Sequence, residues 1–282
     1  MQLKATLLGV GVVAGLSLFA TGASAATTYV KVGQTNHNFL KTKRTIQTTD
    51  EDKQFKLTIP KGTIVDVVET NWHGDKKGQV HVEVNLQRVS YRIRGKHIAF
   101  QTDRILATTK TFKKVHVPQY VQYYTTQKVY PENVSRTRVA DGNLYAGLKV
   151  PDIYRQPKLT AARLYVTSDG YLEYYKSAPV MYLQTTQIPT TSAKITKVKR
   201  VPGKGLTMLY TKTAVPTAIG KRVSKTGNQQ YLTTIKRRYR SSATVFYRGN
   251  AKTAVDSIRL ASLYKVNDHD FFMNTDVVFP EY

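Results

Sequence analysis

Apolar and polar residues alternate with a period of two along much of this chain. The clearest example runs from Val80 through Val82 and Val84 to Leu86, where every intervening residue is polar. A period of two places apolar side chains on one face of a β-strand and polar ones on the other. Val, Ile, Thr and Tyr, which favour strands, are abundant throughout. The pattern therefore predicts an all-β protein.

Short runs rich in Gly, Pro, Asn and Asp separate the alternating stretches. They occupy residues 60–62, 75–78, 94–95, 141–143, 168–170, 202–203, 226–228 and 248–250. Such residues supply the backbone conformations that tight turns need. Many short strands joined by turns at this spacing predict small β-barrels or sandwiches.

Faint internal repeats indicate how the chain is divided. The pattern Tyr-x-x-Tyr-Tyr occurs at 120–124 and again at 171–175. The repeats suggest modules of about 80 residues, within the usual range of domain sizes. Polar runs interrupt the strand pattern at 110–114 and at 190–193. The expected organisation is a signal peptide at 1–25, then β modules at 26–110, 111–192 (rich in tyrosine) and 193–282 (basic).

The N-terminus has the pattern of a secretory signal peptide. Lys4 precedes an uncharged run at 5–22, and Ala23-Ser24-Ala25 supplies the small residues of a cleavage site. This predicts cleavage between Ala25 and Ala26. A retained membrane anchor is the alternative, because the apolar run is close to the minimum length of a span. Four glycines in the run favour cleavage, and the mature protein is expected to have no membrane span.

The chain has 282 residues and no cysteine. A chain of this length buries enough surface to fold without disulfides. Export without cysteine is more typical of a Gram-positive bacterium than of a eukaryotic secretory route. The sequence has neither a lipobox nor a wall-sorting signal. The expected location is therefore extracellular, with non-covalent attachment to the cell wall.

Positive charge is distributed unevenly along the chain, whose net charge is +25. The segment between Glu173 and Asp256 contains no acidic residue, histidine or cysteine but many Lys and Arg residues. Like charges at this density repel one another unless an anionic partner lies against them. Outside a Gram-positive cell the abundant polyanions are teichoic acids, peptidoglycan carboxylates and DNA. Lysine and arginine bind such polymers with release of counterions.

Strand alternation predicts which bases act together. Lys236, Arg238 and Arg240 would share one face of a strand, roughly 7 Å apart, and could contact successive phosphates. Short basic runs near 92–96 and 197–200 show similar spacing. The predicted polyanion-binding residues are Lys197, Lys199, Arg200, Lys236, Arg237, Arg238, Arg240, Arg248, Arg92, Arg94 and Lys96.

Aromatic residues provide a second candidate contact. Tyr123, Tyr124, Tyr174 and Tyr175 have flat amphipathic rings that can stack on sugars or bases, and Trp72 lies in an expected turn. Burial in the core is the commoner fate of tyrosine in β proteins and remains the alternative for these rings.

Catalytic and metal-binding patterns are absent from the sequence. A Ser-x-x-Lys at 262–265 and a Lys-Thr-Gly at 225–227 match pieces of β-lactamase motifs, but in reverse order. No His-Glu-x-x-His occurs, and a cysteine nucleophile is missing. We expect no catalytic residue, no cofactor and no metal. Carboxylates of the first module, such as Asp66 and Glu83, keep glycosidase-type chemistry as an alternative.

Two segments resemble known proteins. Residues 57–68, with the Lys61-Gly62 turn, resemble the opening of bacterial Src-homology-3-like (SH3-like) barrels, which implies that residues 55–109 hold the protein to the cell wall. Residues 170–176 look like uncharacterised exported proteins of lactobacilli, which implies a cell-surface setting. The fold expected from pattern and resemblance together is all-β, with two or three small SH3-like barrel or sandwich modules.

One function is expected, with two alternatives. It is a non-catalytic secreted surface protein that binds an anionic wall polymer, teichoic acid or peptidoglycan, through basic strand faces in residues 190–252. An extracellular nucleic-acid-binding or adhesion module would use the same bases together with stacked tyrosines. A wall-active hydrolase would use the carboxylates of the first module.

Overall fold

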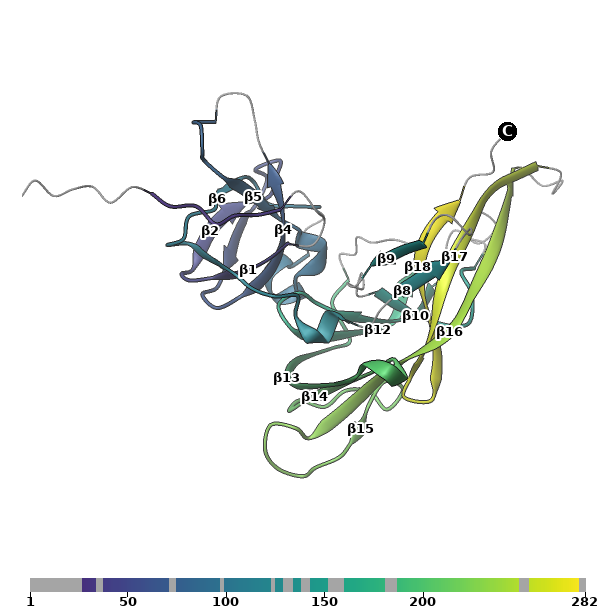
Figure 1. Ribbon diagram of the computed structural model, residues 1–282. Helices are drawn as coiled ribbons and strands as arrows, with labels where there is room; N and C mark the ends of the chain where they lie inside the picture. Colours follow the sequence, from purple (N-terminus) through teal and green to yellow (C-terminus); the bar gives the residue numbers. More distant parts are fainter. Residues whose placement is uncertain are drawn as a thin grey trace, which may run out of the picture.

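A computed structural model gives the fold of the chain (Figure 1). It describes residues 27–33, 38–70, 75–96, 99–122, 125–128, 134–137, 143–151, 160–180, 187–248 and 254–278. Strands dominate this part of the chain, and its helices are one α-helical turn and three short 3-10 turns. The prediction of an all-β protein is confirmed.

The N-terminal unit, defined as residues 27–114, contains a five-stranded antiparallel half-barrel in the order β6-β5-β4-β1-β7. Its strands are β1 (Asn38–Thr42), β4 (Ile64–Thr70), β5 (His81–Val84), β6 (Ile105–Leu106) and β7 (Phe112–Lys114), with a separate hairpin of β2 (Ile46–Thr49) and β3 (Lys56–Ile59). Leu40, Ile59, Val65, Val82 and Val84 are fully buried in one apolar core between these strands.

The alternating run that begins at Val80 forms β5. Val82 and Val84 face the core, whereas His81 and Glu83 are half-buried on the other side. The expected turn at 60–62 joins β3 to β4, and Gly62 there has φ +85°, which a side chain would strain. Local pattern and turn chemistry thus account for this part of the unit.

A 3-10 turn, η1 (Leu86–Arg88), and the single helical turn α1 (Tyr91–Arg94) follow β5. The side chain of Asn85 caps η1 by accepting a hydrogen bond from the Gln87 amide, 3.0 Å away. Gly95 ends α1 with φ +62°. This segment lies against the second part of the molecule and is central to the site described below.

The second part is a nine-stranded antiparallel sheet that closes on itself (Figure 1). Its strands are β10 (Asn143–Ala146), β11 (Thr160–Val166), β12 (Tyr171–Pro179), β13 (Thr191–Val201), β14 (Leu206–Thr211), β15 (Lys221–Arg222), β16 (Tyr231–Arg248), β17 (Ala254–Val266) and β18 (His269–Val278). The order is β14-β13-β12-β11-β10-β18-β17-β16, and β16 pairs back to β14. These eight strands form a closed barrel, and β15 adds to β16 outside the ring. A two-stranded hairpin of β8 (Thr125–Lys128) and β9 (Val134–Thr137) precedes the barrel.

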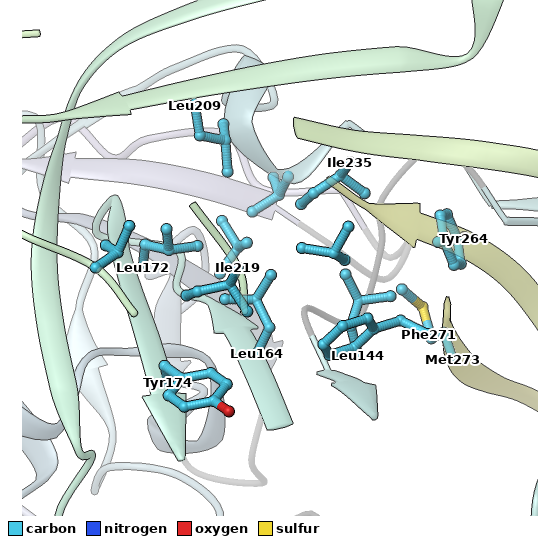
Figure 2. Packing of buried hydrophobic residues seen from close by; sticks show 14 of the residues in the cluster. Leu144, Leu164, Leu172, Tyr174, Leu209, Ile219, Ile235, Tyr264, Phe271 and Met273 are labelled. Carbon is cyan, nitrogen blue, oxygen red and sulfur yellow. The ribbon is translucent and has the colours of Figure 1, made fainter. Parts of the chain in front are cut away.

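Side chains fill the barrel (Figure 2). Leu144, Leu164, Leu172, Leu209 and Ile235 come from five different strands, and each is at most 1% exposed. Residues one position away along the same strands face outwards, so each strand has an inner and an outer side. The interior is therefore a packed core, and the outer surface is where strand residues can meet a partner.

The segment after β7 packs against the barrel core. η2 (Gln119–Val121) buries Val121 completely, and Phe39 of β1 belongs to the same apolar cluster. The hydroxyl of Tyr120 donates a hydrogen bond to the Ser168 carbonyl, 2.6 Å away. Apolar packing therefore continues from the N-terminal unit into the barrel.

The barrel includes strands from both expected modules at 111–192 and 193–282. β13 crosses the expected boundary and pairs with β12 on one side and β14 on the other. Separate SH3-like modules on the two sides of residue 192 are therefore not confirmed. In the part of the chain that the structure describes, no helix has the length and apolar character needed to cross a membrane.

Gly220, immediately before β15, gives a test of this packing. A Cβ at this position would lie 2.2 Å from Val215 Cγ2 and 3.3 Å from the Leu232 carbonyl oxygen. We predict that Gly220→Ala lowers the free energy of unfolding by about 1–3 kcal/mol, as overpacking does. Gly203→Ala is the matched control, because a Cβ there meets no atom within 4 Å. Urea unfolding of both variants measures the effect, and equal stability of the two would contradict it.

Candidate functional site

Three lysines lie on the outer side of β13. Lys197 and Lys199 are exposed and two residues apart, so they share a face as the sequence predicted. A β-bulge between Ile195 and Lys197 inserts one extra residue in this strand. The bulge brings Lys194, three positions before Lys197, to the same outer side.

The register extends this row of bases across neighbouring strands. Lys197 pairs with Tyr210 of β14, Tyr210 with Leu232 of β16, and Leu232 with Lys221 of β15. Paired residues in a sheet point to the same side, so Lys221 lies on the outer side with Lys197. Three strand spacings separate these two lysines, which is roughly 14 Å.

Lys236 of β16 completes this surface. It pairs with Leu206 of β14 and is exposed. We call the outer side of β13, β14, β15 and β16, with Lys197, Lys199, Lys221 and Lys236, the lysine face. Residues 191–248, which contain all four strands, include no Asp or Glu. Its strands therefore contribute only positive charge.

One carboxylate from a more distant strand reaches the margin of the lysine face. Asp270 of β18 lies 2.7 Å from Arg238 Nη1 and 3.1 Å from Lys265 Nζ. The hydrogen bond from Lys265 and the charges of Lys265 and Arg238 lower the pKa of Asp270. Arg238 is thus paired within the fold, which the acid-free stretch of sequence did not reveal.

Two of the predicted bases lie on the inner side of their strands. Arg200 donates from Nη1 to the side-chain oxygen of Gln122, at the end of η2. Arg237 is half-buried and pairs with Tyr264, which is fully buried in the barrel core. Arg200 and Arg237 were predicted to bind a polyanion together with their neighbours, but they lie on the side opposite to Lys199 and Lys236, because alternate residues of a strand point in opposite directions.

The same alternation fails beyond Arg238. The register between β16 and β17 shifts between Arg238 and Ser241, so the regular spacing from Lys236 to Arg240 is interrupted. The side chains of Arg240 and Arg248 lie outside the described part of the structure. So do Tyr123, Tyr124, Trp72, Ala25 and Ala26, the other predicted stacking and cleavage residues.

The remaining predicted bases come from α1 and its C-terminal end, where the N-terminal unit meets the barrel. Arg92 and Lys96 are exposed, whereas Arg94 is only 7% exposed. Arg94 Nη2 donates to the hydroxyl of Tyr175, 2.8 Å away, and lies 3.8 Å from Glu173 Oε2. Arg94 therefore holds the two parts together and is not available to a polyanion.

Acidic groups of the barrel bind the segment around α1. Ser90 donates from its amide and hydroxyl to the two carboxylate oxygens of Asp169, at 2.9 and 2.6 Å. The Tyr91 amide donates to Glu173 Oε1, 2.6 Å away. The Ser168 amide also donates a backbone hydrogen bond of 2.6 Å to the Arg88 carbonyl, which connects the same two parts of the molecule. We call this set of contacts the junction.

The predicted stacking tyrosines Tyr174 and Tyr175 are both buried. Tyr174 packs in the barrel core at 8% exposed, and Tyr175 is 1% exposed at the junction. The hydroxyl of Tyr175 donates to Glu173 Oε2, 2.9 Å away, and the guanidinium carbon of Arg163 lies 4.2 Å from its ring centroid. Neither ring is open to a sugar or base, as the core alternative anticipated.

Glu173 carries the most unusual electrostatics of the junction. It is fully buried, and desolvation raises the pKa of its carboxyl group above 4.5, although the Tyr91 amide and Arg94 act in the opposite direction. Burial likewise raises the pKa of Tyr165 and of Tyr175. The junction is a polar network closed off from solvent.

The carboxylates considered for hydrolysis lie elsewhere in the N-terminal unit. Asp66 is 3% exposed, and its Oδ2 lies 2.8 Å from Arg88 Nε. Glu83 is half-buried, and burial together with the nearby charge of Glu51 raises its pKa. Among the described residues, no cluster of three or more His, Cys, Asp or Glu side chains could hold a metal ion.

Two bases of the surface were missing from the predicted site. Lys194 was overlooked because an odd spacing from Lys197 implies opposite faces in a regular strand. Lys221 was overlooked because a two-residue strand gives no alternation to detect. Comparison with known proteins adds no further assignment: no family model, curated protein or solved structure matches the chain.

Glu173 gives the junction a testable pH dependence. Because its pKa is raised on folding, the folded state binds the proton more tightly than the unfolded state, and ionisation destabilises the fold. We predict that the contribution of Glu173 to the unfolding free energy falls as pH rises above 4.5, the ordinary value.

The measurement is the difference in unfolding free energy between the wild type and Glu173→Gln across pH 4–8. Glutamine keeps the shape and cannot ionise, so subtracting the two curves removes the other carboxylates. We expect the wild type to lose unfolding free energy relative to Glu173→Gln as the pH rises. A difference independent of pH would contradict the proposed role of burial.

Proposed function

We propose that the protein is a non-catalytic, exported cell-surface protein that binds an anionic polymer of the Gram-positive cell wall, teichoic acid, through the lysine face. The observation that carries this proposal is the arrangement of Lys197, Lys199, Lys221 and Lys236. All four are exposed, and they come from β13, β15 and β16, which together with β14 form a set of strands that contains no acidic residue. Such a surface has a concentrated positive potential, which an extended polyanion neutralises.

The geometry suits an extended polymer more than a small ion. Lys197 and Lys199 are about 7 Å apart along β13, and Lys221 lies roughly 14 Å away across the sheet. A chain with a charge on every repeat can contact several of these ammonium groups at once. Each contact releases a counterion, so affinity must fall steeply with salt.

The tyrosines that the structure describes on and near the barrel strands favour a polymer without bases over a nucleic acid as the ligand. Lys197 Nζ lies 5.8 Å from the ring centroid of Tyr210, and Arg222 lies 6.0 Å from that of Tyr231. These rings are engaged by cations, while Tyr174 and Tyr175 are buried. Single-strand binding would need open ring faces for stacking.

The N-terminal unit is proposed to be an SH3-like part that assists attachment without using its exposed lysines, while the lysine face supplies the main attachment to the wall. Five short antiparallel strands and the turn at Lys61-Gly62 support this assignment. The predicted signal peptide at 1–25 supports export.

The proposal predicts that wall binding depends more on where the lysines lie than on the total charge of the protein. Replacing Lys197, Lys199, Lys221 and Lys236 together by glutamine should weaken binding to isolated walls roughly a thousandfold, at about 1 kcal/mol per lysine. The slope of log affinity against log salt should fall by about 3.

The matched control replaces four exposed lysines of the N-terminal unit, Lys56, Lys61, Lys76 and Lys77, by glutamine. It removes the same charge and should bind nearly as the wild type does. Sedimentation with walls in a salt series, before and after teichoic acid is stripped, measures both. Equal losses in the two variants, or unchanged binding to stripped walls, would refute the proposal. Displacement by DNA at lower concentration than by teichoic acid would favour the nucleic-acid alternative.

A further inference from the structure

Two basic side chains from different parts of the molecule meet at one tyrosine ring. Arg92 belongs to α1 of the N-terminal unit, whereas Lys194 and Tyr171 belong to β13 and β12 of the barrel. Arg92 Cζ lies 5.9 Å from the Tyr171 ring centroid, and Lys194 Nζ lies 4.5 Å from it. Arg92 Nη1 also donates to the Tyr171 hydroxyl, 3.3 Å away. Both cations therefore lie within 6 Å of one ring centroid, and the charge of Arg92 acts on Lys194 by lowering its pKa.

Both cations retain capacity for an anion. Arg92 and Lys194 are exposed, and neither forms an ion pair with any residue that the structure describes. Lys194 donates to the backbone carbonyl of Asp169, while the carboxylate of Asp169 is engaged by Ser90. Partial burial lowers the pKa of Lys194, Asp169 opposes this effect, and Arg92 adds to it. An anion placed here would relieve the repulsion between Arg92 and Lys194.

We propose that Arg92 and Lys194 form a composite site for one phosphate group of the polymer bound along the lysine face. The inference rests on the proposed function and extends the binding surface onto the N-terminal unit. The bulge in β13 places Lys194 on the same side as Lys197 and Lys199. A polymer contacting Lys199 and Lys197 therefore meets Lys194 about 10 Å beyond Lys197 along the strand, and then Arg92.

The occupant is a phosphodiester chain without bases. The Tyr171 ring is in contact with both Arg92 and Lys194, so it does not offer a free stacking surface. An ammonium and a guanidinium around a common point suit the oxygens of one phosphate. The site is complete only when α1 is docked on the barrel, so polymer binding should also stabilise the junction.

The test compares single substitutions in binding to purified teichoic acid across a salt series. Arg92→Gln should weaken binding roughly fivefold and reduce the slope of log affinity against log salt by about 1. Arg92→Lys keeps the charge and should retain most of the affinity. Arg44→Gln removes an exposed arginine of the same unit and should have no effect. Lys194→Gln tests the site from the barrel side, in case Arg92→Gln loosens the junction.

The outcomes separate this inference from the function on which it rests. The inference is overturned if Arg92→Gln and Lys194→Gln keep wild-type affinity and slope while the fourfold lysine variant loses binding. It is also overturned if Arg92→Lys loses as much affinity as Arg92→Gln. If the fourfold lysine variant itself binds as the wild type does, the proposed function fails first. Teichoic acid should also raise the melting temperature of the wild type more than that of Arg92→Gln.

Discussion

Pairing between β14 and β16 is the interaction on which the rest of the structure depends. Every residue of β14, from Leu206 to Thr211, pairs with a residue of β16, and this closes the barrel. Closure buries Leu209 and Ile235 against the other strands and leaves alternate residues outside. It also sets the acid-free strands side by side. The lysine face is thus a consequence of how the core is closed, because the side chains between the buried ones must point outwards.

The junction makes the charge distribution more uneven. Asp169 and Glu173, the two acids that precede the acid-free segment in sequence, form contacts with Ser90, Tyr91 and Arg94. Their carboxylates are engaged in contacts inside the molecule. Packing of α1 against the barrel therefore supports binding in two ways, since it hides carboxylates and brings Arg92 towards the outer surface of β12 and β13.

Local patterns predicted that the protein is all-β, that a turn lies at Gly62, and that Lys197 and Lys199 lie on the same face of one strand. These features depend only on neighbours in sequence. The position of Lys194 depends on a bulge, and that of Asp270 on a pairing between distant strands, so alternation could not reveal either. The continuity of the barrel across residue 192 was missed for the same reason, because long-range pairing leaves no local signal. Burial of Arg94 depends on contact between the two parts.

Modification of lysines with and without polymer tests the central claim most directly. Teichoic acid is added to the wild-type protein, exposed lysines are acetylated, and the extent of reaction at each site is read by mass spectrometry. The account predicts that Lys197, Lys199, Lys221 and Lys236 become protected, while exposed lysines of the N-terminal unit, such as Lys56, react as before. Equal protection of both groups would show attraction to net charge alone and would contradict a binding face on the barrel.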